Sequence, residues 1–138
     1  IAQHDVQGQR VLDYGCGSGI LAIGAAQYGA TEIDAVDIDE AAVTSTELNA
    51  KANGVQLKAG LPDKAQGQYQ TVLANILASA LIALHDTLAA RTQTGGLIAL
   101  SGILKGQEHE VLAAFASHFE ALTVTQHDDW IRIDGRKR

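Results

Sequence analysis

VLDYGCGSG, residues 11–19, is a short apolar run followed by glycine at every second position. Glycine inside a strand or helix costs about 0.5–1 kcal/mol relative to alanine, so this spacing indicates a turn of special geometry. The flanking residues predict a strand over 10–14 and a helix over 19–29. A turn between a strand and a helix aims backbone N–H groups and the positive end of the helix dipole at its occupant. The stretch therefore predicts a ligand-binding loop, although a tight turn without a ligand is the alternative.

Short β-type runs alternate with longer helical runs through the rest of the chain, with Asp39 in the position of a helix N-cap and Gly95-Gly96 as a turn. This order predicts a doubly wound α/β fold: a mainly parallel seven-stranded sheet with an antiparallel C-terminal edge hairpin. Further strands are expected at residues 32–38, 55–59, 69–76, 97–103, 120–126 and 130–135, and further helices at 40–54, 78–92 and 106–119.

Composition limits the classes of function. The 138 residues, 46% of them hydrophobic, suit one domain, and we expect residues 1–138 to form it. The sequence has no membrane span or signal-peptide layout, so a cytoplasmic location is expected. A net charge of −6 argues against a general nucleic-acid binder, and the basic residues at 132–138 are interpreted as a solvated terminus. The chain has no methionine and starts with Ile1, so we expect a fragment of a longer protein.

A second acid accompanies the glycine loop. Asp37 closes the second predicted strand 22 residues after Gly15, the spacing at which a carboxylate accepts both hydroxyls of a ribose. In doubly wound sheets ligands bind beyond the carboxyl ends of the strands, where the loop and Asp37 are both expected. Together they predict a nucleotide-like cofactor.

The position of Asp13 discriminates between cofactors. It lies two residues before Gly15, where a carboxylate would repel a pyrophosphate and attract an ammonium group. The dinucleotide-binding motif G-x-G-x-x-G/A matches the sequence when it starts at Gly17. When it starts at Gly15, Ile20 stands where the motif requires its third glycine or an alanine. S-adenosylmethionine has an ammonium group and no phosphate, so the sequence favours it over NAD.

Asn75 ends the fourth predicted strand, in LANILAS at residues 73–79, and places a carboxamide at the same sheet edge. Its alternative role is a cap for the following helix. Cys16, the single cysteine, is interpreted as a packed residue rather than a nucleophile, and it excludes an internal disulfide. No metal site is predicted, because the histidines are scattered and none forms an H-E-x-x-H motif. They are His4, His85, His109, His118 and His127.

VLDYGCGSGILAIGAAQYGA and AVDID resemble the first glycine motif and the following acidic motif of class I S-adenosylmethionine-dependent methyltransferases. This resemblance implies that Asp13 orients the amino-acid end of the cofactor and that Asp37 holds its ribose. It also implies further cofactor-binding positions, including Asn75, and leaves the late acid Asp63 without a clear role. These further positions are Gly15, Cys16, Gly17, Ile38, which would pack on the adenine, and Gly60 and Leu61, which would border it.

Asn75 resembles the asparagine of the Asn-Pro-Pro-Tyr motif in methyltransferases that modify nitrogen. The resemblance implies that its side-chain oxygen accepts a hydrogen bond from the nitrogen and aims its lone pair at the methyl group. The prolines and the aromatic residue of that motif are replaced here by Ile76, Leu77 and Ala78. An aliphatic amine is therefore expected in preference to a planar base.

The set DYGCGSGILAI, AVDIDEAAV, ANILA, GGLIALSGIL and DDWIRIDGRKR resembles the ribosomal protein L-eleven methyltransferase family (PrmA-type) over essentially the whole chain. The family methylates lysine side chains and the N-terminal amine of a large-subunit ribosomal protein, which would be the partner. Family members also carry an N-terminal substrate-recognition domain and a linker, and both would precede Ile1. A monomer that contacts neither membrane nor nucleic acid is expected.

Three alternatives stay open. The first is another amine- or amide-directed class I methyltransferase. The second is an NAD-dependent oxidoreductase, which would need a Tyr-x-x-x-Lys pair that Tyr14, Tyr28 and Tyr69 do not provide. The third is a non-catalytic cofactor-binding domain.

Overall fold

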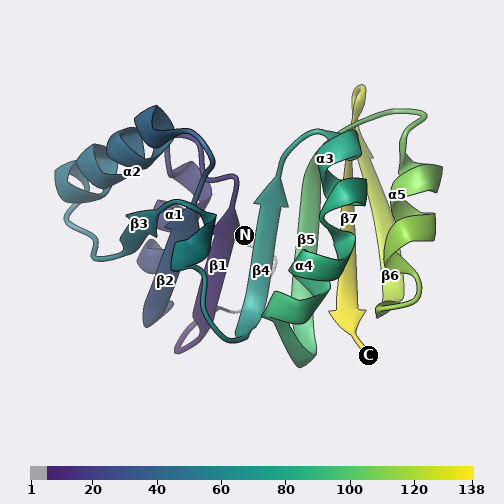
Figure 1. Cartoon of the computed structure of the whole chain (residues 1–138), viewed down its shortest axis with the longest axis horizontal. Coiled ribbons are helices and arrows are strands. Elements are labelled where there is room, and N and C mark those ends of the chain that lie inside the picture. Colours follow the sequence, from purple (N-terminus) through teal and green to yellow (C-terminus); the bar gives the residue numbers. More distant parts are fainter. Residues whose placement is uncertain (1–5) are drawn as a thin grey trace.

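The computed structural model describes residues 6–138 and contains one seven-stranded sheet in the order β3-β2-β1-β4-β5-β7-β6 (Figure 1). The first five strands in this order, from β3 through β2, β1 and β4 to β5, are parallel to one another. Strand β7 lies between β5 and β6 and runs antiparallel to both. The predicted α/β fold with an antiparallel edge hairpin is confirmed. The elements are β1 (Arg10–Tyr14), α1 (Ile20–Gln27), β2 (Glu32–Val36), α2 (Glu40–Ala52), β3 (Lys58–Gly60), η1 (Pro62–Lys64), β4 (Tyr69–Asn75), α3 (Ala78–Ala83), α4 (His85–Arg91), β5 (Thr92–Leu104), α5 (Glu108–Phe115), β6 (Phe119–His127) and β7 (Trp130–Lys137).

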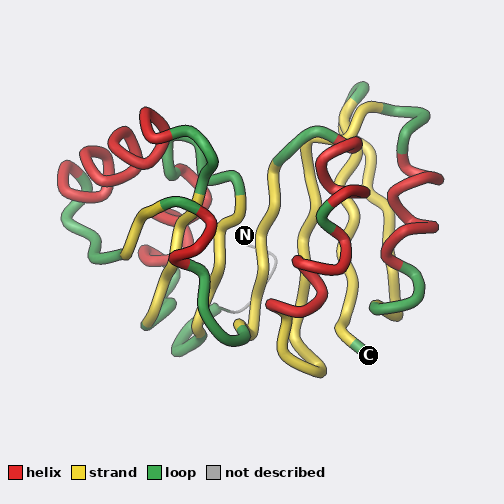
Figure 2. Tube along the Cα trace, viewed as in Figure 1, coloured by secondary structure: helices red, strands yellow, loops and turns green. Residues whose placement is uncertain are grey.

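The order of the strands reverses between β1 and β4, because the chain builds outward from β1 to β3 and then returns to the other side of β1. At such a point the loops that leave the two neighbouring strands diverge and open a crevice beyond their carboxyl ends. Figure 2 shows the loops that follow β4 and β5 at the upper edge of the sheet. This edge is where the glycine loop and Asn75 were expected to meet.

Successive side chains of each strand point to opposite faces of the sheet, so the apolar core is divided between these two faces. Leu12 and Ile98 belong to the larger core cluster, which includes the buried side chains of α3, α4 and α5. Val11 and Ala99 belong to the smaller cluster with α1. Figure 1 shows α3, α4 and α5 grouped over the half of the sheet that runs from β4 to β6.

Two predicted elements are shifted or divided. The third strand was expected at 55–59 but covers Lys58–Gly60, because only these residues come into register with β2. The helix expected at 78–92 is broken at Leu84, where ψ is 7°. The sequence contains no glycine or proline at this point, so periodicity alone could not locate the break.

The expected turn at Gly95-Gly96 lies inside β5, which begins at Thr92. Gly95 has φ of 79°, and the pairing with β4 passes from Thr92 directly to Leu97, so the two glycines lie in a tight turn within the residues assigned to β5. The basic C-terminal residues are not a free terminus, because β7 extends to Lys137. Within it, Arg136 donates a hydrogen bond of 2.7 Å to the carbonyl oxygen of Gly95.

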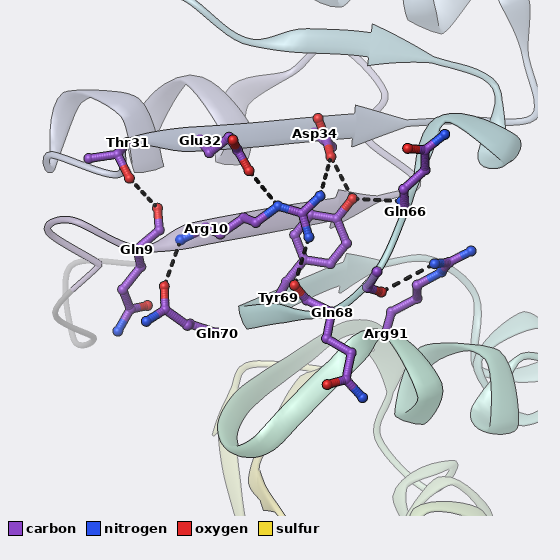
Figure 3. Close-up of polar contacts among 11 residues, drawn as sticks. Gln9, Arg10, Thr31, Glu32, Asp34, Gln66, Gln68, Tyr69, Gln70 and Arg91 are labelled. Atoms are coloured by element: carbon purple, nitrogen blue, oxygen red, sulfur yellow. Dashed lines mark hydrogen bonds and ion pairs between the residues drawn. The ribbon is translucent and has the colours of Figure 1, made fainter.

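A polar network joins the first halves of β1, β2 and β4 (Figure 3). The guanidinium of Arg10 lies 4.0 Å from the centre of the Tyr69 ring and donates to Glu32 at 2.5 Å. The hydroxyl of Tyr69 donates to the buried carboxylate of Asp34 at 2.5 Å. The network stabilises the end of the sheet opposite the glycine loop.

None of the helices in residues 6–138 is long and apolar enough to span a membrane.

Candidate functional site

The glycine loop leaves β1 through a tight set of backbone hydrogen bonds. The N–H groups of Gly15 and Cys16 both donate to the carbonyl oxygen of Val36, at 2.8 and 3.0 Å. Gly19 donates to the carbonyl oxygen of Cys16 at 2.8 Å. Gly15, Gly17 and Gly19 all have positive φ, at 81°, 56° and 87°, which explains the alternating glycines.

The three glycines differ in what surrounds them. A Cβ atom on Gly15 would lie 2.3 Å from Cγ2 of Ile76, and one on Gly19 would lie 2.8 Å from Cγ2 of Thr46. A Cβ atom on Gly17 would meet nothing within 4 Å. Packing within the chain therefore explains two of the glycines, whereas Gly17 leaves open space beside the loop for a ligand.

Helix α2 packs against the glycine loop and forms hydrogen bonds to it through Thr46. The hydroxyl of Thr46 donates to the carbonyl oxygen of Gly17 at 3.0 Å and contacts Sγ of Cys16 at 3.3 Å. Burial raises the pKa of the Cys16 thiol, and the hydrogen bond from Thr46 offsets part of this effect. A protonated, buried thiol fits the packed role predicted for Cys16 and does not fit a nucleophile.

Asp37 connects the loop to the end of β2. Its Oδ2 accepts a hydrogen bond from the Gly17 N–H at 3.0 Å, and its Oδ1 accepts one from the Asp39 N–H at 2.9 Å. Asp39 in turn caps α2 by accepting from the N–H of Ala41, as predicted. Asp37 thus lies against the predicted cofactor loop in a fixed orientation, with carboxylate lone pairs left for further donors.

Asp13 is the most unusual group of the site. Its side chain is 1% exposed, and neither carboxylate oxygen has a hydrogen-bond partner within residues 6–138. Burial raises the pKa of Asp13 from 3.8 to about 7. The N–H of Ala22 offsets part of this rise without completing a hydrogen bond, and the charge of Asp37 adds to it. A buried acid without a partner is costly, and a ligand that brings a positive charge would remove this cost.

Two cavities flank the loop. Asp13, Cys16 and Gly17 line a small one of about 240 Å³. Asp37 and Ile38 line a larger one of about 410 Å³, and Gly17 lines both cavities. Ile38 is 84% exposed although it is apolar, so it offers a free surface to a planar group. The arrangement can hold a charged end beside Asp13 and an aromatic end beside Ile38.

Asn75 lines both of these cavities and also a third one. The N-cap of α3 is Leu77, and no side chain makes a cap hydrogen bond there. The alternative in which Asn75 caps the following helix is therefore wrong. Asn75 lies where the three cavities adjoin, a position at which a reacting group could meet a bound cofactor.

The third cavity, of about 670 Å³, lies between Asn75 and the β6–β7 hairpin and has mostly apolar walls. Trp130, Thr125 and Ser101 line it, and the Trp130 side chain is 53% exposed. The sequence analysis did not identify these wall residues. Trp130 is the single tryptophan of the chain, which was the available signal, but its approach to Asn75 depends on the pairing of β7 with β5.

Gly102 is a further position that the sequence analysis did not single out. It has φ of 84°, and a Cβ atom there would lie 2.5 Å from the carbonyl oxygen of Ile76 and 3.0 Å from Oδ1 of Asn75. It lies where the pairing of β5 with β7 shifts between Leu100 and Ile103. Gly102 therefore allows β5 to pass close behind Asn75.

Gly60 and Leu61, predicted to border the cofactor base, lie farther from the centre of the site. The carbonyl oxygen of Gly60 accepts a hydrogen bond from the N–H of Asp37 at 3.1 Å, but neither residue lines the three cavities. Asp63 is exposed in η1. Their contact with a cofactor stays a prediction.

The histidines are less scattered in space than in sequence. His85 and His118 approach each other with ring centres 5.6 Å apart, which their separation of 33 residues did not indicate. His127 lines the third cavity. His4 lies outside the described residues.

A model of the family described as ribosomal protein L11 methyltransferase (PrmA) matches residues 1–138. The chain belongs to the ribosomal protein L11 methyltransferase family. It is 54% identical over 137 residues to the ribosomal protein L11 methyltransferase of Xanthomonas axonopodis pv. citri. That match covers 97% of this chain and 45% of the relative, so the chain spans less than half the length of that protein.

Two solved structures of methyltransferases resemble the chain, one from the L11 methyltransferase family and one from outside it. The ribosomal protein L11 methylase of Lactobacillus delbrueckii subsp. bulgaricus superposes with a TM-score of 0.90 and 32% identity, over 99% of this chain and 74% of that one. Magnesium protoporphyrin IX methyltransferase of Synechocystis PCC 6803 superposes with a TM-score of 0.77 over 99% of this chain and 74% of that one. At 23% identity, the second likeness concerns the fold alone. The chain has the class I methyltransferase fold.

Proposed function

We propose that the chain binds S-adenosylmethionine and transfers its methyl group to amines of ribosomal protein L11, on lysine side chains and at the N-terminus. The observation that carries this proposal is the position of Asn75 at the junction of three cavities. Two of them adjoin the glycine loop and would hold the cofactor. The third would receive the amine.

Asp13 supports the choice of cofactor. Its buried carboxylate has no hydrogen-bond partner in the described chain and would accept the ammonium group at the methionine end. Asp37 would accept the ribose hydroxyls, and Ile38 would pack on the adenine. NAD offers the pyrophosphate of a dinucleotide, which the Asp13 carboxylate would repel. An NAD-dependent oxidoreductase therefore fits the site less well.

S-adenosylmethionine supplies, when bound, a methyl group on a sulfonium sulfur, which an amine nitrogen takes in one displacement, leaving S-adenosylhomocysteine. The displacement requires a neutral amine, and a lysine with a pKa near 10.4 in water must lose its proton first. The side-chain oxygen of Asn75 would accept a hydrogen bond from the amine and orient its lone pair. Such positioning supplies much of the acceleration in a reaction with little acid–base chemistry.

The third cavity supports an aliphatic amine as the acceptor. Its walls are mostly apolar and include Ile76, Leu77 and Trp130. An apolar wall suits the methylene stem of a lysine and disfavours the charged form of an amine that lies against it. Trp130 would form the wall of the acceptor cavity on the side of the β6–β7 hairpin.

The chain corresponds in this proposal to the catalytic domain of a longer protein. It covers 45% of the relative from Xanthomonas axonopodis. Recognition of the ribosomal protein would then depend largely on a separate N-terminal domain, with a monomer acting in the cytoplasm. Incubating the chain and a full-length relative with the ribosomal protein and labelled cofactor tests this division, and equal turnover by the two would contradict it.

Replacing Asn75 by alanine tests the catalytic role. We expect Asn75→Ala to lower methyl transfer from labelled S-adenosylmethionine to ribosomal protein L11 by about 100-fold or more, in line with other losses of a transition-state hydrogen bond. Affinity for the cofactor, measured by calorimetry, should change by only a few-fold. Asn53→Ala is the matched control, since Asn53 is an exposed residue at the end of α2.

Unchanged transfer by Asn75→Ala would contradict the catalytic role of Asn75. Cofactor binding by the wild-type chain would favour a non-catalytic binding domain if the chain also transferred no methyl group to free aliphatic amines at high concentration, which need no separate recognition domain.

A further inference from the structure

Three metal-ligating side chains converge on the face of the sheet covered by α3, α4 and α5. His85 and Asp86 begin α4, and His118 lies between α5 and β6. One ligand atom from each side chain lies within 4.8 Å of the other two. Figure 1 shows α4 and α5 on the same side of the sheet, which explains how residues 33 positions apart come together.

The distances approach those of a zinc site. Nε2 of His118 forms a hydrogen bond of 2.9 Å with Oδ1 of Asp86, which a metal ion would replace, and Nδ1 of His85 lies 3.3 Å from the same oxygen. Neighbouring ligand atoms of a tetrahedral zinc ion with bonds of about 2.0–2.1 Å lie about 3.3 Å apart. Two of the three separations are therefore close to the required value, and small side-chain rotations would bring the two imidazoles closer.

His85 carries an unsatisfied group. Its Nδ1 is buried and has no hydrogen-bond partner within residues 6–138, because the nearby Asp86 oxygen does not complete one. The ring packs edge-on against Phe115, with ring centres 6.3 Å apart. A metal ion would give this ring nitrogen a partner.

Two backbone hydrogen bonds hold His118 in place. Its N–H donates to the carbonyl oxygen of Phe115 at 3.1 Å, and its own carbonyl oxygen accepts from the N–H of Arg138 at 3.0 Å. The side chains of His85 and His118 are each about one-third exposed, at 31% and 32%, whereas that of Asp86 is 79% exposed. Three protein ligands at a partly open surface leave a fourth position for water.

We propose that His85, Asp86 and His118 form a binding site for a divalent transition-metal ion, with zinc as the best match. Two imidazoles and one carboxylate suit zinc, whereas magnesium and calcium prefer oxygen ligands. The ion would join the start of α4 to the segment between α5 and β6. The site shares no residue with the methyl-transfer site, so either proposal can fail without the other.

Titrating zinc chloride into the chelator-treated chain, with any purification tag removed, tests this site. Calorimetry should show one saturable site that is lost when magnesium replaces zinc. Zinc at about 100 times its dissociation constant should raise the melting temperature by roughly 5–10 °C, since it binds only the folded state.

Variants identify the ligands. His118→Gln and Asp86→Asn should each weaken zinc binding at least tenfold and remove most of the thermal shift. His109→Gln is the matched control, because His109 is exposed on α5 and outside the cluster. Asp86→Asn, at an exposed position, remains decisive if His118→Gln does not fold. The absence of saturable zinc binding, wild-type affinity in Asp86→Asn, or equal affinity for magnesium would each overturn the proposal.

Discussion

Two neighbouring strands each bury one aspartate, and the surroundings of the two side chains are opposite. Asp34 on β2 is 7% exposed and accepts a hydrogen bond from the hydroxyl of Tyr69, with Arg10 completing an ion pair at 3.5 Å. Asp13 on β1 is 1% exposed and has no hydrogen-bond partner in residues 6–138. Figure 3 shows the partners of Asp34, which come from β1 and β4.

The difference distinguishes a structural acid from a binding acid. The network around Asp34 satisfies its charge and also raises the pKa of Tyr69, through burial first and the hydrogen bond to Asp34 second. It therefore stabilises the folded chain without any ligand. Asp13 has only part of the same compensation, and in the proposed function the ammonium group of the cofactor supplies the remainder when the carboxylate is charged. We infer that the unpaired acid at the carboxyl end of the sheet lowers the stability of the cofactor-free chain and raises its affinity for the cofactor.

The largest expected effect is on cofactor affinity. Asp13→Asn removes the charge that would pair with the ammonium group, and losing one partner of a buried ion pair costs about 3–5 kcal/mol. Affinity for S-adenosylmethionine, measured by calorimetry at pH 8, should fall by at least 100-fold.

Asp34→Asn is the paired control for this comparison. It should lower the free energy of unfolding by about 1–3 kcal/mol, because it weakens the contacts with Tyr69 and Arg10, and it should leave cofactor affinity nearly unchanged. If the two variants lowered affinity equally, the distinction between the two aspartates would be lost.

The second effect is a dependence of stability on pH. The folded chain holds a proton on Asp13 up to its pKa of about 7, whereas the unfolded chain releases it near 3.8. Between these values the folded state binds more protons, so the free energy of unfolding falls as pH rises through this window. A shift of this size corresponds to up to about 4 kcal/mol. Denaturant unfolding of the cofactor-free chain at pH 5 and pH 8 measures it.

Asp13→Asn should remove most of this slope and leave the chain more stable than wild type at pH 8. Asp34→Asn should keep the slope. If the free energy of unfolding changed with pH equally in wild type and in Asp13→Asn, the pKa of Asp13 in the folded chain would lie well below 7, and the account of its burial would be wrong.

The smallest effect separates the ligand-facing glycine from an ordinary turn glycine. Gly17 and Gly54 both have positive φ, at 56° and 66°, and both have open space where a Cβ atom would lie. Alanine at either position should lower the free energy of unfolding by about 1–2 kcal/mol, the usual cost of a left-handed conformation. Only Gly17→Ala should also weaken cofactor binding. Equal affinity in the two variants would place the cofactor away from the loop.

Much of the geometry of the candidate site was predictable because its signals are local. Asp13 lies in β1, whereas the glycine loop and Asp37 directly follow β1 and β2, and the alternation of strands and helices indicated which edge of the sheet they share. The N-cap at Asp39 also follows from one residue and its neighbours.

The remainder depends on contacts between distant segments. The lack of a hydrogen-bond donor for Asp13 among residues 6–138 cannot be read from its neighbours in sequence, because it depends on which segments the fold brings near. Trp130 reaches the cavity at Asn75 only through the pairing of β7 with β5. The cluster of His85 and His118 likewise depends on the packing of α4 beside α5, and the break at Leu84 has no breaker residue to mark it.

Calorimetric titration of the wild-type chain with S-adenosylmethionine and, separately, with NAD at pH 8 tests the central claim most directly. The claim is that the unpartnered Asp13 is reserved for an ammonium group rather than a phosphate. We predict saturable binding of S-adenosylmethionine and binding of NAD at least tenfold weaker. NAD that binds as tightly as S-adenosylmethionine, or more tightly, would contradict the account.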